Sequence, residues 1–274
     1  MKYRFYGSLL ILAAGISSCS SHIYVPNTVN VPLLKERNEF KASISPTNLQ
    51  TAFALTDNIA IMANGQYVYP LVRWAEDERT STRNNIFVDD NTRGGIIEGA
   101  VGFFKPLDPK KRMVFDVYAG GGAGSFRTFT RKSDRDGTVP LENYRLKNQF
   151  SKFFIQPSIG FAHPVVEAAF SSRFTLLNFY NPYMGPKAFE NNESAKADFL
   201  KTSGNPIFTY DPAFTFRVGY KYVKFQMQLM CSVPLNNNYD FGDYQFNDYL
   251  QPFSLTMGAS VNIARWYDNF RKKR

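Results

Sequence analysis

Side chains that could act as acids, bases or nucleophiles are few in this chain of 274 residues. Two histidines are present, His22 near the start and His163 directly before Pro164. Nucleophilic catalysis needs a serine, threonine or cysteine next to a base that is itself held in place by a third group. No such set can be assembled around either histidine, so we expect a protein that is not an enzyme.

Two other segments have the composition of ligand sites but not their spacing. The glycine-rich segment 120–124 lacks the Lys and Ser/Thr that follow in a phosphate-binding loop, and it does not fit the dinucleotide-binding pattern. Within a strand, glycines more often permit curvature or the close approach of a neighbour. The acidic connection 235–250 has no EF-hand spacing and is expected to be a solvated loop. We therefore expect no cofactor and no metal site.

The start of the chain has the order of an export signal. Lys2 and Arg4 give a basic beginning, residues 9–16 are apolar, and small residues precede Cys19. The apolar stretch is too short to cross a bilayer as a helix. Residues 1–18 are therefore expected to be a cleaved signal peptide.

The last four residues of this signal, Ile16-Ser17-Ser18-Cys19, resemble the bacterial lipobox. The resemblance implies that Cys19 is acylated on its sulfur and on its new amino terminus. Two or more acyl chains anchor a protein stably, because each buried methylene contributes about 0.8 kcal/mol. An ordinary secretory signal is the alternative. Cys231 is the other cysteine, so an acylated Cys19 leaves no disulfide framework.

From residue 39 onward the hydrophobic pattern has a period of two, which indicates β-strands. In residues 253–263 every odd position is apolar and every even position is small or polar. We predict strands at residues 39–45, 49–56, 58–69, 94–105, 112–129, 149–162, 165–181, 206–220, 222–234 and 251–263. Several reach the roughly 9–11 residues that a tilted strand needs to cross a bilayer.

The connections between these strands alternate in length. After the first hairpin, short connections at 56–58, 106–111, 163–164 and 220–222 alternate with long ones at 70–93, 130–148, 182–205 and 235–250. Outer-membrane barrels have short periplasmic turns, long extracellular loops and an even number of strands. We therefore predict an all-β fold: a closed antiparallel up-and-down transmembrane barrel of about ten strands over residues 39–263, with both termini in the periplasm.

Charged residues in the predicted strands fall on the face opposite the apolar one. Facing lipid at the midplane would cost an Arg or Lys roughly 2–4 kcal/mol, so these groups should point into the lumen. The predicted lumen network consists of Glu98, Asp116, Lys152, Arg173, Asp211, Arg217 and Lys224. Its carboxylates should pair with its basic groups and plug a narrow lumen, since buried charges must be compensated. A thin channel lined by the same residues is the alternative.

The formal net charge of +9 comes largely from the expected periplasmic end, at residues 105–112 and in the basic, aromatic tail 264–274. Anionic phospholipid headgroups attract such clusters, at about 1 kcal/mol per basic residue. Trp266, Tyr267 and Phe270 fit an interfacial aromatic belt. A solvated tail is the alternative. Nucleic acid is not an expected partner, because no basic face is interleaved with stacking aromatics.

These patterns resemble the barrel lipoproteins that are common in Bacteroidota, and residues 24–28 together with 40–45 look like the mature start of that group. Two features depart from it: Pro157 and Pro212 fall within strands, where bulges could accommodate them, and the chain does not end on a strand-terminal aromatic residue. The resemblance implies no catalytic motif.

We therefore expect an outer-membrane lipoprotein with a structural, adhesive or loop-mediated binding role and an unidentified loop ligand. Residues 19–38 should form a lipidated, extended periplasmic tether along or under the barrel. A periplasmic, lipocalin-like lipoprotein that holds an apolar ligand is one alternative, and it would turn Phe253, Leu255 and Met257 inward and Arg217 and Lys224 outward. A narrow outer-membrane pore is a second alternative. A lipid-modifying enzyme is a third, but it lacks a histidine base.

Overall fold

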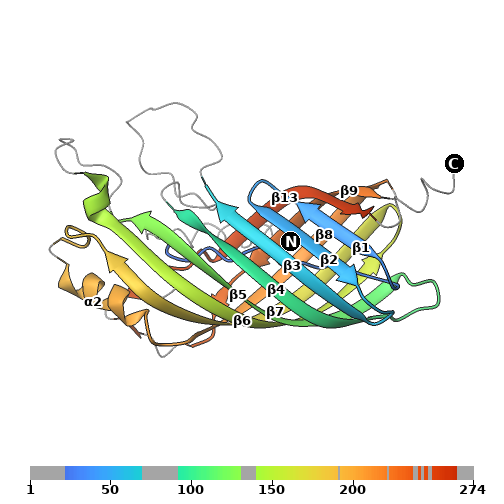
Figure 1. The fold of residues 1–274 in the computed structure, drawn as a ribbon, viewed down its shortest axis with the longest axis horizontal. Helices are drawn as coiled ribbons and strands as arrows, with labels where there is room; N and C mark the ends of the chain where they lie inside the picture. The colour runs from blue at the N-terminus through green and yellow to red at the C-terminus, as the bar shows by residue number, and fades with distance from the viewer. Residues whose placement is uncertain are drawn as a thin grey trace, which may run out of the picture.

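The computed structural model describes residues 22–69, 92–130, 140–190, 192–220, 222–236, 240–241, 244–245 and 249–263. They form a closed antiparallel up-and-down barrel of ten strands, which confirms the predicted fold class (Figure 1). The strands are β1 (Phe40–Ile44), β2 (Asn48–Ala54), β3 (Ile59–Val68), β4 (Arg93–Pro106), β5 (Met113–Phe129), β6 (Arg145–Ala162), β7 (Val166–Met184), β8 (Ile207–Tyr220), β9 (Val223–Cys231) and β13 (Phe253–Asn262). The barrel closes where β13 pairs with β1, from Lys41–Asn262 to Ile44–Ala259.

Smaller elements lie at one end of the barrel. The 3-10 helix η1 (Leu141–Tyr144) precedes β6, and α2 (Glu193–Lys201) follows β7. The two-residue strand β10 (Val233–Pro234) extends the edge of β8, while β11 (Asp240–Phe241) and β12 (Tyr244–Gln245) pair with each other. Among the residues that the structure describes, no helix is long and apolar enough to cross a bilayer.

Alternation along the strands separates two faces of opposite character. The outward face is apolar: Ile97 is 77% exposed, Phe153 67% and Met257 49%. The inward face carries polar and charged residues, with Arg217 only 2% exposed and Lys224 6%. Phe253 and Leu255 are half-buried on the strand that also carries Met257. The polarity is therefore inverted relative to a water-soluble barrel, in which the apolar side chains fill the interior.

Neither strand proline requires a bulge. The register between β6 and β7 is the same before and after Pro157, and only the pairs at Gln156 and Pro157 are missing. Pro212 lies where the partner of β8 changes from β9 to β10, so its missing N–H falls at an interruption of that ladder. The irregularity in the β6–β7 ladder lies elsewhere, between Lys147 and Gln149.

The two ends of the barrel differ. The turn end carries the short connections, including 55–58 and 107–112, whereas the loop end carries η1, α2 and residues 249–250 (Figure 1). Strands β5, β6 and β7, of 17, 18 and 19 residues, form the longest part of the wall. β1 starts and β13 ends at the turn end, because Lys41 pairs with both Ala52 and Asn262.

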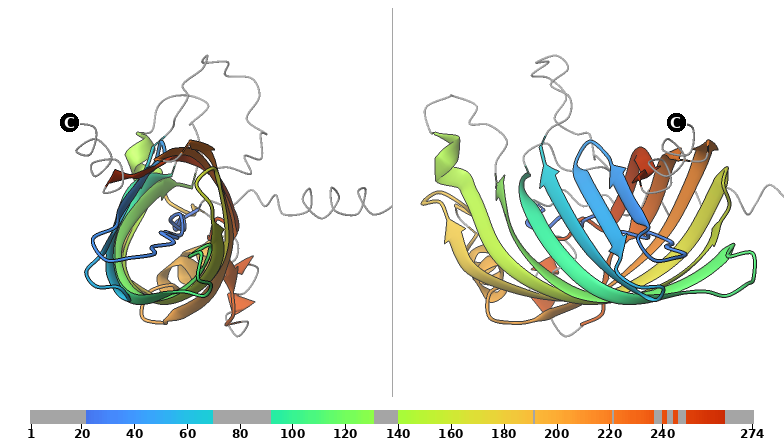
Figure 2. Two further views of the ribbon diagram at one scale, coloured as in Figure 1. Left: turned by 90° about the vertical axis from the view of Figure 1, so that its right-hand side faces the viewer. Right: turned by 45° about the vertical axis from the view of Figure 1, so that its right-hand side comes forward.

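The N-terminal segment, residues 22–38, does not run along or under the barrel as expected: its residues 23–34 lie inside (Figure 2). At the loop end, the backbone N–H groups of Ile23 and Tyr24 donate to the carbonyl of Tyr249. At the turn end, Leu34 packs against Ala54 and Ala60. The segment therefore passes through the lumen from the loop end to the turn end before β1 begins.

Candidate functional site: the filled lumen

The buried charges of the barrel wall balance. Among the described residues of the wall, five acidic and five basic ones at positions 39–224 are each at most 7% exposed. They are Glu39, Lys41, Glu98, Asp116, Lys152, Glu167, Arg173, Asp211, Arg217 and Lys224. Equal numbers allow the interior to be neutral overall, which lowers the cost of removing charges from water. The predicted network omitted Glu39, Lys41 and Glu167.

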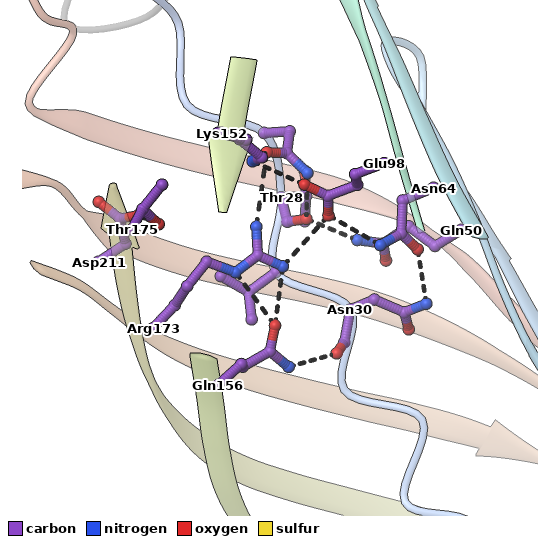
Figure 3. A network of polar contacts seen from close by, with 12 residues as sticks. Thr28, Asn30, Gln50, Asn64, Glu98, Lys152, Gln156, Arg173, Thr175 and Asp211 are labelled. Carbon is purple, nitrogen blue, oxygen red and sulfur yellow. Dashed lines mark hydrogen bonds and ion pairs between the residues drawn. The ribbon is translucent and has the colours of Figure 1, made fainter. Parts of the chain in front are cut away.

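Midway through the lumen, Glu98 of β4 forms ion pairs with two basic groups (Figure 3). Its carboxylate lies 2.6 Å from Lys152 Nζ and 3.3 Å from Arg173 Nη2. Gly122 of β5 stands between Glu98 and Lys152 in the ladder, so the two side chains meet across a position that has no side chain. The Arg173 guanidinium also lies 4.4 Å from the ring centre of Phe154, a cation–π contact.

Amide side chains connect this ion pair to the N-terminal segment. Asn64 Nδ2 donates to Glu98 Oε1 at 2.8 Å, and Asn30 Nδ2 donates to Asn64 Oδ1 at 2.7 Å. Gln156 Oε1 accepts from Arg173 Nη2 at 2.7 Å, while its Nε2 donates to the carbonyl of Asn30 at 2.7 Å (Figure 3). We call Asn64, Glu98, Lys152, Gln156 and Arg173 the central network.

Nearer the turn end, Glu167 collects the other basic groups. It lies 2.7 Å from Lys224 Nζ, 3.1 Å from Arg217 Nη1 and 3.7 Å from Lys41 Nζ. Lys224 Nζ also donates to the carbonyl of His163 at 2.7 Å. These ion pairs tie β1, β7, β8 and β9 together across the line at which the barrel closes.

Side chains of the wall satisfy the main chain of the N-terminal segment, which forms no sheet with the barrel. Carbonyls accept hydrogen bonds as follows: Thr28 from Gln50 (2.8 Å), Val29 from Gln228 (2.7 Å), Asn30 from Gln156 (2.7 Å), Val31 from Arg217 (2.8 Å) and Leu33 from Lys41 (2.9 Å). Gln228 Oε1 also accepts from the Val29 N–H at 2.8 Å. Buried backbone groups must find partners, so the lumen functions as a site for an extended peptide, and this chain supplies that peptide.

Aromatic rings close the lumen at the loop end. Tyr24 is 1% exposed and makes edge-on contacts with Phe126, Phe150 and Phe179, at centroid distances of 5.1–6.1 Å. Next to it Ile23 belongs to a buried cluster with Phe199 of α2 and Tyr249. At the turn end a cavity of about 30 Å³, lined by Lys35, Lys41, Glu167 and Lys224 among others, has room for about one water molecule.

Two of the predicted ion pairs are wrong. Asp211 has no basic partner within ion-pair distance in the described part of the chain; it accepts hydrogen bonds from Thr175 at 2.8 Å and from Ser232. Asp116 is fully buried, and among the described residues neither of its carboxylate oxygens has a hydrogen-bond partner of normal geometry, although Ser158 stands opposite it in the ladder. The four basic groups of the predicted network pair with Glu98 and Glu167 instead.

The remaining predicted groups lie away from the lumen or outside the described residues. His163 is in the turn before β7, where its Nδ1 accepts from the Val165 N–H at 3.3 Å. Cys231 is free and exposed on the outer face of β9. Cys19, the tail residues Trp266, Tyr267 and Phe270, and half of the connection 235–250 fall outside the described residues. No cluster of metal-ligating residues occurs among those that the structure describes.

Sequence reasoning missed the N-terminal segment as a part of the site. A signal was available, because residues 23–34 contain no charged side chain. A tether in water has no reason to exclude charge, whereas a peptide buried in a narrow lumen has one. No known family model matches the chain, and no curated protein matches it in a search.

Proposed function

We propose that this protein is an outer-membrane β-barrel lipoprotein whose lumen is sealed by its own N-terminal segment, and that it serves as a structural, adhesive or binding scaffold through its loop end. The observation that carries the proposal is the inverted polarity of the barrel. Large apolar side chains such as Ile97 and Phe153 face outward on strands of 14 and 18 residues, while ten charges face inward. Exposed apolar surface on this scale is costly in water and stable in lipid.

The filled lumen favours a scaffold over the two main alternatives. A lipocalin-like carrier needs an apolar cavity, whereas this interior holds charges, amides and the N-terminal segment. A pore needs a continuous water path, and Tyr24 with its aromatic neighbours occupies the loop end. The described interior therefore supports neither a carrier nor a pore.

The loop end offers an ordered platform for binding. Helix α2 begins at an N-cap, where Asn192 Oδ1 accepts a hydrogen bond from the Ala195 N–H at 2.9 Å. Phe199 of this helix belongs to the same buried cluster as Ile23 of the N-terminal segment. Binding residues commonly lie on loops that a rigid scaffold holds in position. We assign the binding role to this end, where the long connections also emerge.

The test is extraction of the full-length protein from washed membranes. We expect it to stay in the membrane after alkaline carbonate treatment, both as the wild type and as Cys19→Ala. After detergent extraction, the unboiled and boiled protein should migrate differently on a denaturing gel, because a closed barrel resists the detergent until it is heated. Release of Cys19→Ala into the soluble fraction, with no heat shift, would show that lipid alone holds the protein and would contradict the proposal.

A further inference from the structure

The path of the N-terminal segment decides where an anchor attached to Cys19 can lie. Residue 22 is at the loop end, and the Gln251 N–H donates to the Tyr24 carbonyl at 3.1 Å, next to the hydrogen bonds from Ile23 and Tyr24 to Tyr249. Thr92 Oγ1, at the loop-end start of β4, donates to the His22 carbonyl at 3.0 Å. Contacts to two separate parts of the chain, residues 249–251 and Thr92, therefore hold the segment where it enters the lumen.

Covalent reach limits the position of Cys19. Cys19 lies three positions before His22, and an extended chain covers at most about 3.6 Å per residue, so the two α-carbons are within about 11 Å of each other. The path from Tyr24 to Leu34 takes ten residues, roughly 30 Å of extended chain. Cys19 therefore cannot reach the turn end, and the filled lumen leaves no space for it to pass through the barrel to that end.

We infer that the acylated N-terminus is anchored at the loop end, on the side opposite the short turns. The inference rests on the proposed function. In a barrel with its long connections outside, the acyl chains of Cys19 enter the outer leaflet, so the lipid lies on the cell surface and not in the periplasm. The ligand of this site is the outer leaflet, and the anchor stands beside the platform formed by α2.

The same geometry sets an order of assembly. A diacyl group cannot be drawn through a lumen filled by side chains, so the barrel must close around a segment that is already in place. The seam between β1 and β13 has four residue pairs, whereas β5 and β6 share 17. This short seam is the natural line of closure, and Lys41 at the seam also holds the Leu33 carbonyl.

The experiment measures which markers a membrane-impermeant reagent reaches on intact cells that express the full-length chain. The background is Cys231→Ser, which should itself stay unlabelled by a maleimide because the acylated Cys19 has no free thiol. Glu193→Cys marks the loop end, where the Glu193 side chain is 84% exposed, and Lys110→Cys marks an exposed position of the β4–β5 turn. A short epitope inserted between residues 21 and 22 marks the N-terminus.

We expect the epitope and Glu193→Cys to be reached on intact cells, and Lys110→Cys only after permeabilisation. If Glu193→Cys is reached but the epitope is not, the anchor is periplasmic; the inference then fails while the outer-membrane proposal stands. If no marker is reached until the cells are opened, the chain is not at the surface and both fail. Acylation is checked separately by the mass of the N-terminal peptide.

Discussion

At the scale of single residues, the interior depends on groups that compensate one another. Glu98 is held by Lys152, Arg173 and Asn64, so its removal leaves two buried cations with reduced compensation. Breaking a buried pair by removing one partner typically costs roughly 3–5 kcal/mol, and we expect a loss of stability of that size here. Asp116, by contrast, is buried without such a partner among the described residues.

We therefore predict that two isosteric changes differ in their effect on stability. Glu98→Gln should lower the free energy of unfolding by about 3–5 kcal/mol. Asp116→Asn should leave it unchanged or raise it, because an unpaired buried charge is lost. Urea unfolding of the protein refolded into lipid vesicles measures both. If Asp116→Asn proves as costly as Glu98→Gln, Asp116 has a partner that this account lacks.

Gly122 provides a second prediction at this scale. A β-carbon there would lie 2.5 Å from the Ile97 carbonyl oxygen and 2.7 Å from Glu98 Cβ, so Gly122→Ala should disturb the central network. Overpacking of this kind costs about 1–3 kcal/mol. Gly65→Ala on β3 is the matched control, because nothing lies within 4 Å of its β-carbon position. Equal unfolding curves for the two variants would refute the prediction.

At the scale of elements, alternation of apolar and polar residues made the strands predictable, because each strand has one face toward the lumen and one face outward. Residues 253–263 illustrate this: the strand over Phe253–Asn262 was found within one to two residues of its observed bounds. The N-terminal segment could not be found in the same way. Its neighbours lie on many strands at once, from Gln50 of β2 to Gln228 of β9, so no sequence period marks its burial.

The site was predictable only in part, for a related reason. Periodicity placed Glu98, Lys152 and Arg173 on the inward face but could not pair them, because pairing depends on how the strands are staggered around the barrel. Glu167 shows this: it forms ion pairs with three basic groups, whereas the predicted network left it out and included Asp116 and Asp211.

An element-scale prediction concerns the hold of the wall on the segment. Gln228→Leu removes both hydrogen bonds to the Val29 main chain, leaving a buried N–H and a carbonyl without these partners. The segment should then open more often. In a Cys231→Ser background, we expect a cysteine at Thr28 to react with maleimide at least tenfold faster with Gln228→Leu than with the outward-facing control Met227→Leu. Equal rates would show that Gln228 does not retain the segment.

The β4–β5 turn gives a prediction with a defined pH dependence. Asp108 Oδ1 accepts from the N–H groups of Met113 at 2.6 Å and Arg112 at 2.7 Å, and these hydrogen bonds lower the pKa of Asp108 below its usual range. A lowered pKa means that the stabilisation is complete above the ordinary Asp range and is lost as the pH falls through the lowered value. Amide NMR signals of Arg112 and Met113 should shift over that acidic range in the wild type and stay constant in Asp108→Asn.

At the scale of the whole molecule, the barrel is a closed wall around its own first residues. Charge balance in the wall, the aromatic closure around Tyr24 and the hydrogen-bonded carbonyls of residues 28–31 and 33 all concern one buried peptide. The full-length protein should therefore form no stable conducting channel in a planar bilayer. A reproducible conductance from the intact protein would contradict the filled lumen.

The most direct test of the central claim uses Thr28 of the segment and Thr256 of β13, whose hydroxyl oxygens lie 3.3 Å apart. Sulfur atoms at these positions are close enough for a disulfide after a small adjustment. In the full-length Cys231→Ser protein, Thr28→Cys with Thr256→Cys should oxidise almost completely in the folded, membrane-bound state, and the unboiled barrel band should persist. An intact barrel band with no cross-link would place the segment outside the lumen and contradict this account.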